Sequence, residues 1–120
     1  MNELKIITLH LGSGASVAAI KDGKAFDSSM GFTPLTGLTM GTRAGDVDPA
    51  IVPFLMEKED MTAEEVMTLL NDQSGLLGIS ESSSDMRDIE AAWKKGDHQA
   101  SLAREIFINR VVKYVGAYFA

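Results

Sequence analysis

The dipeptide Asp22-Gly23 is the feature that most constrains how this chain folds. Asp-Gly forms two-residue turns in which both residues have positive φ, and such turns connect antiparallel strands. Apolar and small residues flank it at 16–21 and 25–30. A β-branched apolar run at 4–11 ends at Gly12 and indicates a buried strand. The sequence therefore predicts an antiparallel meander of three strands.

Helical signals follow. Asp48 and Pro49 predict a helix start, with Asp48 as N-cap and Pro49 as the first helical residue. Residues 62–65 read Thr-Ala-Glu-Glu, a capping box that begins another helix, and Gly75 fits the C-cap of that helix. The apolar run at 76–79 fits either a strand or a buried connection.

Two more helices are expected near the end of the chain. Residues 82–85 are a polar helix start, and Gly96 ends that helix. Asp97 caps a last helix that continues towards Ala120 without a stop signal, and this indicates truncation of a longer domain. Strands followed by helices give an α/β class, and we expect residues 1–120 to form a single incomplete domain.

Residues 31–47 form the glycine loop, which separates the strands from the helices. It contains four glycines, one proline and four threonines, so regular structure is not expected. A loop of this length in a small domain is typically functional or disordered.

Composition excludes several classes of protein. The formal net charge of −6 disfavours a nucleic-acid-binding protein, which needs a basic face. The chain has no cysteine, which excludes disulfides and thiolate metal sites. No apolar run reaches the roughly 20 residues of a membrane span, and the first residues do not resemble a signal peptide. A cytoplasmic protein is therefore expected.

The turn between the first two predicted strands reads His10-Leu11-Gly12-Ser13-Gly14. Glycines let a backbone approach a phosphate closely, and successive amides in such a turn can bind an anion. The alternative is an ordinary glycine-rich hairpin with His10 hydrogen-bonded in the core. No Gly-Lys-Ser/Thr sequence follows, so this is not a P-loop.

Two other groups of residues can contribute to chemistry. Arg43, inside the glycine loop, can grip phosphate or carboxylate oxygens, or it can pair structurally with Asp46 or Asp48. Asp85 and Arg87 can contact a ribose and a base, or Asp85 or Ser84 can simply cap a helix whose first turn carries solvated charges.

Together these segments resemble the acetate kinase family. The turn fits that family's H-x-G-x-G-x-S signature. The likeness covers essentially the whole chain, and the stretches that carry it are Ile7–Val17, Ser29–Leu35, Met40–Arg43, Asp48–Leu55, Ser74–Gly78 and Asp85–Asp88.

The resemblance implies a partial actin-like ATPase (ribonuclease H-like) domain, specifically the N-terminal part of the second domain. It implies transfer of the γ-phosphoryl of ATP to acetate, giving acetyl phosphate and ADP, with Mg²⁺ held by residues outside this chain. Arg43 is then the catalytic residue that stabilises the transition state. The nucleotide-binding residues are His10, Leu11, Gly12, Ser13, Gly14, Asp85, Met86 and Arg87.

One residue departs from the family pattern: Ser13 stands where the family usually has asparagine, which removes an amide donor. The family's first domain and a later adenosine loop are missing, so we expect the chain alone to be inactive. Two alternatives remain, a propionate kinase segment and a non-catalytic module that binds nucleotide or self-associates. An exposed strand edge would also promote a homo-oligomer.

Overall fold

The computed structural model describes residues 3–120. The strands β1 (Lys5–Leu11), β2 (Ala15–Lys21) and β3 (Lys24–Ser28) form one antiparallel sheet in the order β1-β2-β3. Asp22 and Gly23 connect β2 to β3 with φ values of 50° and 76°. The predicted meander and its two-residue turn are confirmed.

The prediction that the first strand is buried is wrong. β1 pairs only with β2, and apart from the half-buried Ile7 its residues are exposed. Leu9 and Leu11 lie opposite Val17 and Ala15, yet remain 44% and 54% exposed. Val17 and Ala15 are fully buried, because β2 is the central strand. An apolar run alone does not distinguish a central strand from an edge strand.

The first two helices, α1 (Ile51–Lys58) and α2 (Ala63–Asp72), follow the glycine loop. Asp48 is not the N-cap: its carboxylate accepts from the Ala50 amide at 2.9 Å in a turn that precedes the helix, and α1 begins at Ile51. The predicted capping box of α2 is confirmed, since Thr62 and Glu65 accept from each other's amides.

Gly75 was predicted to end α2, but it begins the next helix, α3 (Gly75–Ser80). The run at 76–79 is therefore helical, rather than a strand or a connection. Its first amides explain why: Leu76 and Leu77 donate to the carbonyls of Met40 and Gly41 at 2.9 and 3.0 Å. The partners that fix this short helix lie more than thirty residues away, beyond the reach of a local sequence pattern.

The last two helices are α4 (Met86–Lys94) and α5 (His98–Phe119). Asp85 and Asp97 are their N-caps, as predicted, and Gly96 lies between them with a φ of +87°. Within residues 3–120 no helix is long and apolar enough to cross a membrane.

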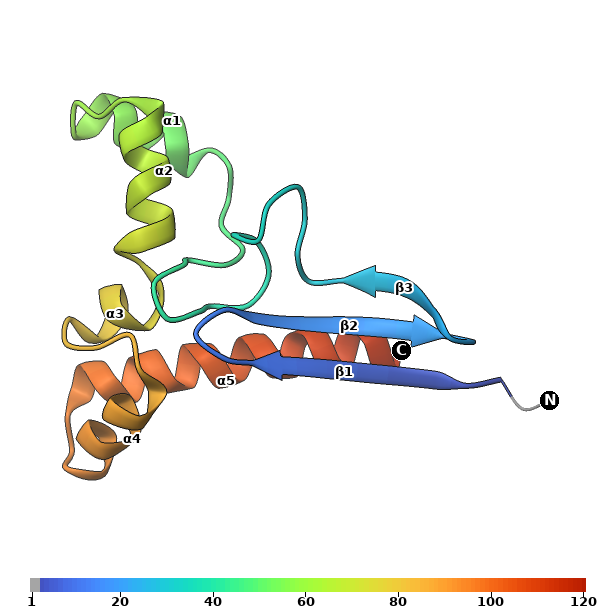
Figure 1. Cartoon of the computed structure of the whole chain (residues 1–120). Helices are drawn as coiled ribbons and strands as arrows, with labels where there is room; N and C mark the ends of the chain where they lie inside the picture. The colour runs from blue at the N-terminus through green and yellow to red at the C-terminus, as the bar shows by residue number, and fades with distance from the viewer. Residues whose placement is uncertain (1–2) are drawn as a thin grey trace.

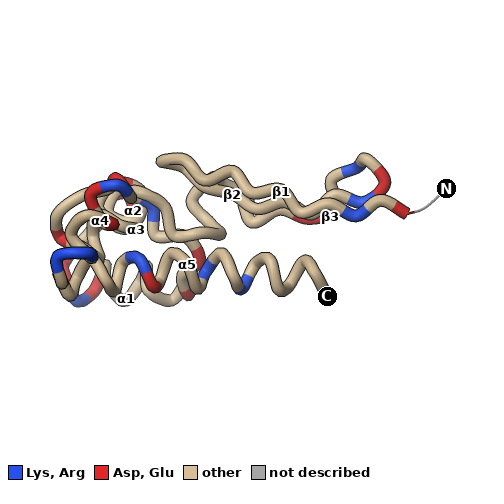
Figure 2. Tube along the Cα trace, turned by 90° about the horizontal axis from the view of Figure 1, so that it is seen from below, with Lys and Arg blue, Asp and Glu red and all other residues tan. Residues whose placement is uncertain are grey.

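Helix α5 organises the molecule. Its C-terminal half lies along one face of the sheet (Figure 2), and its N-terminal half passes α3 and α4. The helices α1 and α2 stand apart from it (Figure 1). Three small clusters form the core. They are centred on Ala15, Val17, Leu38 and Met40 under the sheet, on Leu76, Ile89, Ala100 and Ala103 between the last helices, and on Leu35, Val66 and Leu70 beside α2.

Candidate functional site

The glycine loop has no regular secondary structure, as predicted, but backbone hydrogen bonds attach it to α2 and α3. The Ala44 amide donates to Leu70 O at 2.9 Å, and the Thr42 hydroxyl donates to Asn71 O at 2.8 Å. The Ser74 amide in turn donates to Thr42 O at 2.9 Å. The segment around Arg43 is therefore ordered by contacts on both sides.

The turn Gly12–Gly14 lies against this loop. The Gly41 amide donates to Ser13 O at 3.1 Å, which ties the tip of the β1–β2 hairpin to the loop. The Gly12 amide already donates to Gly14 O, at 3.1 Å. Among residues 3–120, the amides of Ser13 and Gly14 donate to no other group, so two of the three turn amides retain donor capacity for a ligand.

His10 lies near the same turn. It is exposed at the end of β1, and its Nε2 is 3.6 Å from the position that a Cβ on Gly12 would occupy. The imidazole makes no hydrogen bond to the described residues, so it is not the core histidine of the structural alternative.

Arg43 is not held by either acid that could have paired with it. Asp48 accepts from Ala50, and Asp46 is bound to α5. The Nη1 atom of Arg43 lies 3.5 Å from the position of a Cβ on Gly14 and 3.9 Å from Met40 Sδ. The guanidinium therefore borders the hairpin turn, and no carboxylate within residues 3–120 neutralises it.

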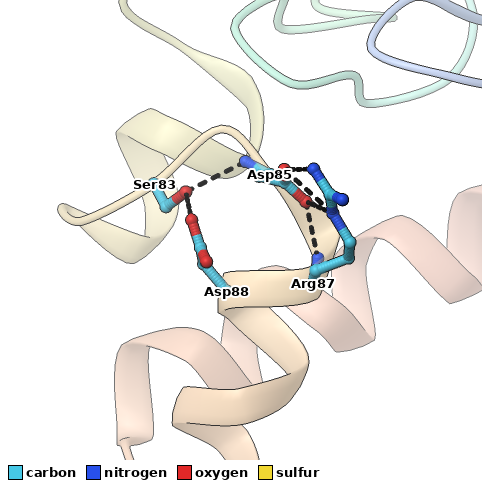
Figure 3. A network of polar contacts seen from close by, with 4 residues as sticks. All are labelled: Ser83, Asp85, Arg87 and Asp88. Carbon is cyan, nitrogen blue, oxygen red and sulfur yellow. Dashed lines mark hydrogen bonds and ion pairs between the residues drawn. The ribbon is translucent and has the colours of Figure 1, made fainter.

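Asp85 and Arg87 form an exposed ion pair (Figure 3). Arg87 Nη2 lies 2.6 Å from Asp85 Oδ2, and the Arg87 amide donates to Asp85 Oδ1 at 2.8 Å. These hydrogen bonds lower the pKa of the Asp85 carboxyl to about 2. Ser83 accepts from the Asp85 amide and donates to Asp88, so the start of α4 is ordered before any ligand arrives.

A cavity of about 560 Å³ joins the hairpin turn to the start of α4. Among the predicted site residues, it brings together Leu11, Gly12, Ser13, Asp85, Met86 and Arg87. His10, Gly14 and Arg43 do not line it: Gly14 belongs to the turn, and His10 and Arg43 lie beside it.

Four lining residues were not predicted as site residues: Gly41, Leu76, Ser84 and Phe107. Gly41 had a signal, since it lies two residues before Arg43 in a glycine-rich segment. A Cβ there would lie 3.0 Å from Ser84 O. Phe107 had no such signal in the sequence, because its helical spacing indicates only a buried face.

The described residues offer no metal site. Within residues 3–120, no three His, Asp or Glu side chains gather closely enough to hold an ion. The carboxylate beside the cavity, Asp85, is bound to Arg87.

Comparison with known proteins gives one consistent result. A sequence model of the Acetokinase family matches residues 1–120. The acetate kinase of Moorella thermoacetica is 60% identical over 120 residues, and that of Shouchella clausii is 58% identical. Both alignments cover 100% of this chain but 30% of the relative, so the chain spans about 30% of the length of the curated relatives it matches.

Solved structures agree. The acetate kinase of Porphyromonas gingivalis matches 95% of this chain and 29% of its own, with a TM-score of 0.93 and 55% identity. A propionate kinase from Francisella tularensis matches 94% of this chain and 29% of its own, with a TM-score of 0.92 and 48% identity. The fold is therefore that of the acetate kinase structures, with an actin-like ATPase architecture, as expected from the sequence.

Proposed function

Because the chain belongs to the acetokinase family, we propose that it is the nucleotide-phosphate segment of an enzyme that transfers the γ-phosphoryl of ATP to acetate. The products are acetyl phosphate and ADP. One observation supports this above the others: a single cavity joins the glycine turn to the Asp85–Arg87 pair, and an unneutralised Arg43 borders that turn.

The proposed roles follow from the chemistry. In phosphoryl transfer, negative charge spreads over the equatorial oxygens while the entering and leaving oxygens lie in line. Donors fixed in advance stabilise that charge without reorganisation. We assign the phosphates to the amides of Ser13 and Gly14, with His10 beside them. Arg43 stabilises the transferring group, because a guanidinium stays charged and presents several donors in one plane.

The adenosine is assigned to the other end of the cavity. Asp85 can accept from ribose hydroxyls, and the planar Arg87 side chain, which is 90% exposed, can stack on a base. Leu11 and Met86 supply apolar contact surface beside them.

Magnesium accompanies ATP in this family, but the described residues do not fit a magnesium site. Magnesium requires oxygen ligands in octahedral geometry, and the Asp85 carboxylate is already bound to a guanidinium. We therefore assign the protein ligands of the ion to the parts of a full-length relative that this chain does not cover.

The chain alone is expected to be catalytically inactive. It corresponds to about 30% of a full-length relative, and we assign it to the first part of the second domain. In in-line transfer the acetate approaches the γ-phosphoryl from the side opposite to the leaving ADP. This segment does not supply the surfaces that would bind the acetate. We assign the reaction to the cytoplasm, where ATP is available.

Propionate remains a second candidate substrate, since a propionate kinase shares the fold at 48% identity. In our assignment this cavity holds the nucleotide, so it does not determine whether acetate or propionate is accepted. A stand-alone nucleotide-binding module is the other alternative, because the cavity is formed by this chain without help.

An exchange experiment tests the proposal. The matching segment of the Moorella thermoacetica acetate kinase is replaced by this chain, and acetyl phosphate synthesis is measured with acetate and with propionate. We expect the chimera to be active and the isolated chain to be inactive. The proposal is wrong if the chimera folds but has no kinase activity, or if the isolated chain makes acetyl phosphate.

A further inference from the structure

Asp46 lies at the centre of a hydrogen-bond network that closes the glycine loop. The Gly37 amide donates to Asp46 Oδ1 at 2.8 Å, and the Asp46 amide donates to Gly37 O at 2.9 Å. These two bonds join residues nine positions apart, so the segment 37–46 forms a closed ring. Arg43 lies within this ring.

Two side chains of α5 hydrogen-bond to the two ends of this ring. Arg110 Nη1 donates to Gly37 O at 3.2 Å and to Asp46 O at 3.1 Å. It also lies 3.9 Å from Asp46 Oδ2. The Tyr114 hydroxyl donates to that same carboxylate oxygen. We call the three side chains of Asp46, Arg110 and Tyr114 the Asp46 network.

The network is separate from the proposed ligand site. None of its three residues lines the cavity between the hairpin turn and α4. A tyrosine phenol, with an ordinary pKa of 10.0, is already protonated at neutral pH and can donate; burial, with the hydrogen bond to Asp46 as the next cause, raises the pKa of Tyr114 further.

We propose that the Asp46 network positions Arg43 for phosphoryl transfer by fixing both ends of its loop to α5. This inference rests on the proposed function, because it gives Arg43 a catalytic task. The network acts through the backbone: it holds Gly37 and Asp46, while the Met40 amide donates to Arg43 O at 3.0 Å inside the ring. Asp46, Arg110 and Tyr114 are positioning residues, since none of them lines the cavity.

The structural alternative is that the network only stabilises the fold. The two possibilities differ in kinetics. A residue that positions Arg43 affects the transition state and lowers kcat, whereas the KM for ATP changes little because the cavity is untouched. Small displacements of a catalytic group are costly, since the reacting geometry has to be held closely.

The test is a double-mutant cycle in the Moorella chimera. Arg43→Ala is expected to lower kcat by about a thousandfold. Tyr114→Phe, which removes one hydroxyl, is expected to lower kcat by roughly tenfold, with the KM for ATP unchanged. In the Arg43→Ala background, Tyr114→Phe should cause no further loss, because the group that it positions is gone.

Tyr118 provides a matched control one turn along α5. Its ring stacks edge-on against that of Tyr114, but its buried hydroxyl has no hydrogen-bond partner among residues 3–120. Tyr118→Phe should therefore leave kcat unchanged. In the isolated 120-residue chain, Tyr114→Phe should speed hydrogen exchange at the Gly37 and Asp46 amides, and Tyr118→Phe should not.

Three results would overturn the inference: an unchanged kcat in Tyr114→Phe, an equal loss in Tyr118→Phe, or additive losses with Arg43→Ala. If Tyr114→Phe does not fold, Arg110→Met enters the same cycle, since it keeps the aliphatic stem and removes the donors. An unchanged kcat in Arg43→Ala would instead contradict the proposed function itself, so the two failures are distinguishable.

Discussion

Asp85 and Arg87 lie at the end of the cavity that we assign to the adenosine, and Asp85 also caps α4. The Asp85 carboxylate accepts from the Arg87 amide and from its guanidinium at the same time. The structure shows the capping role, which is compatible with ligand binding, and the binding role remains our proposal. The sequence predicted both residues as site residues, but it could not show that their side chains hydrogen-bond to each other.

The Asp85 carboxyl is predicted to titrate near pH 2 rather than near its ordinary value of 3.8, chiefly because Arg87 hydrogen-bonds to it. A pKa that is lower in the folded state stabilises that state above pH 3.8. This contribution is lost as the pH falls towards 2. Because both side chains are exposed, the effect on stability is small.

Carboxyl ¹³C chemical shifts followed against pH measure this titration. Arg87→Ala should move the Asp85 midpoint back towards 3.8. Arg104→Ala is the matched control. Arg104, on α5, pairs with Glu90, further along α4, so its removal should leave the Asp85 midpoint unchanged. An Asp85 midpoint near 3.8 in the unmodified chain would contradict the geometry of Figure 3.

Among the elements, α3 depends on residues far away in the sequence, because its first amides donate to Met40 O and Gly41 O. The sequence predicted the β2–β3 hairpin and the capping box of α2, because Asp22-Gly23 and Thr62–Glu65 are local signals. It misassigned Gly75, since a glycine after an apolar helical pattern also fits a C-cap. Its φ of +62° and its contact with Met40 follow from the path of the glycine loop.

Gly75→Ala is predicted to be strongly destabilising. A Cβ there would lie 2.2 Å from Met40 O and 2.8 Å from Arg43 O, so the loop backbone would have to move. Strain at positive φ costs about 1–2 kcal/mol, and the overpacking adds about 1–3 kcal/mol. The free energy of unfolding in urea measures the sum.

Gly96→Ala is the control for that substitution. Gly96 also has a positive φ, of +87°, but a Cβ there would meet nothing within 4 Å. It should therefore show only the cost of strain, about 1–2 kcal/mol. Equal losses in the two variants would mean that the contact between α3 and the loop is not as close as the structure has it.

The molecule as a whole is elongated. Its Cα radius of gyration is 16.1 Å, whereas a compact domain of this length is expected near 14 Å. Large apolar side chains remain exposed, including Phe26 at 77%, Phe32 fully and Phe119 at 87%. The exposure of β1 could not be predicted from its apolar run, since strand order depends on the whole sheet.

Self-association of the isolated chain is predicted from these surfaces. The free edge of β1 offers unpaired backbone groups, and Leu9 and Leu11 beside it are half exposed. Light scattering should detect a dimer or a larger assembly. Leu11→Lys, which places a charge at this edge, should shift the population towards monomer, whereas a monodisperse monomer before any substitution would refute the prediction.

Amide chemical-shift mapping with two ligands tests most directly whether the glycine turn binds phosphate. ADP and adenosine are titrated separately into the ¹⁵N-labelled chain, up to millimolar concentration. We predict that both move the amides of Asp85, Met86 and Arg87, and that ADP alone moves those of Ser13 and Gly14. If ADP shifts the Ser13 and Gly14 amides no more than adenosine does, the turn does not bind the phosphates and its proposed role is wrong.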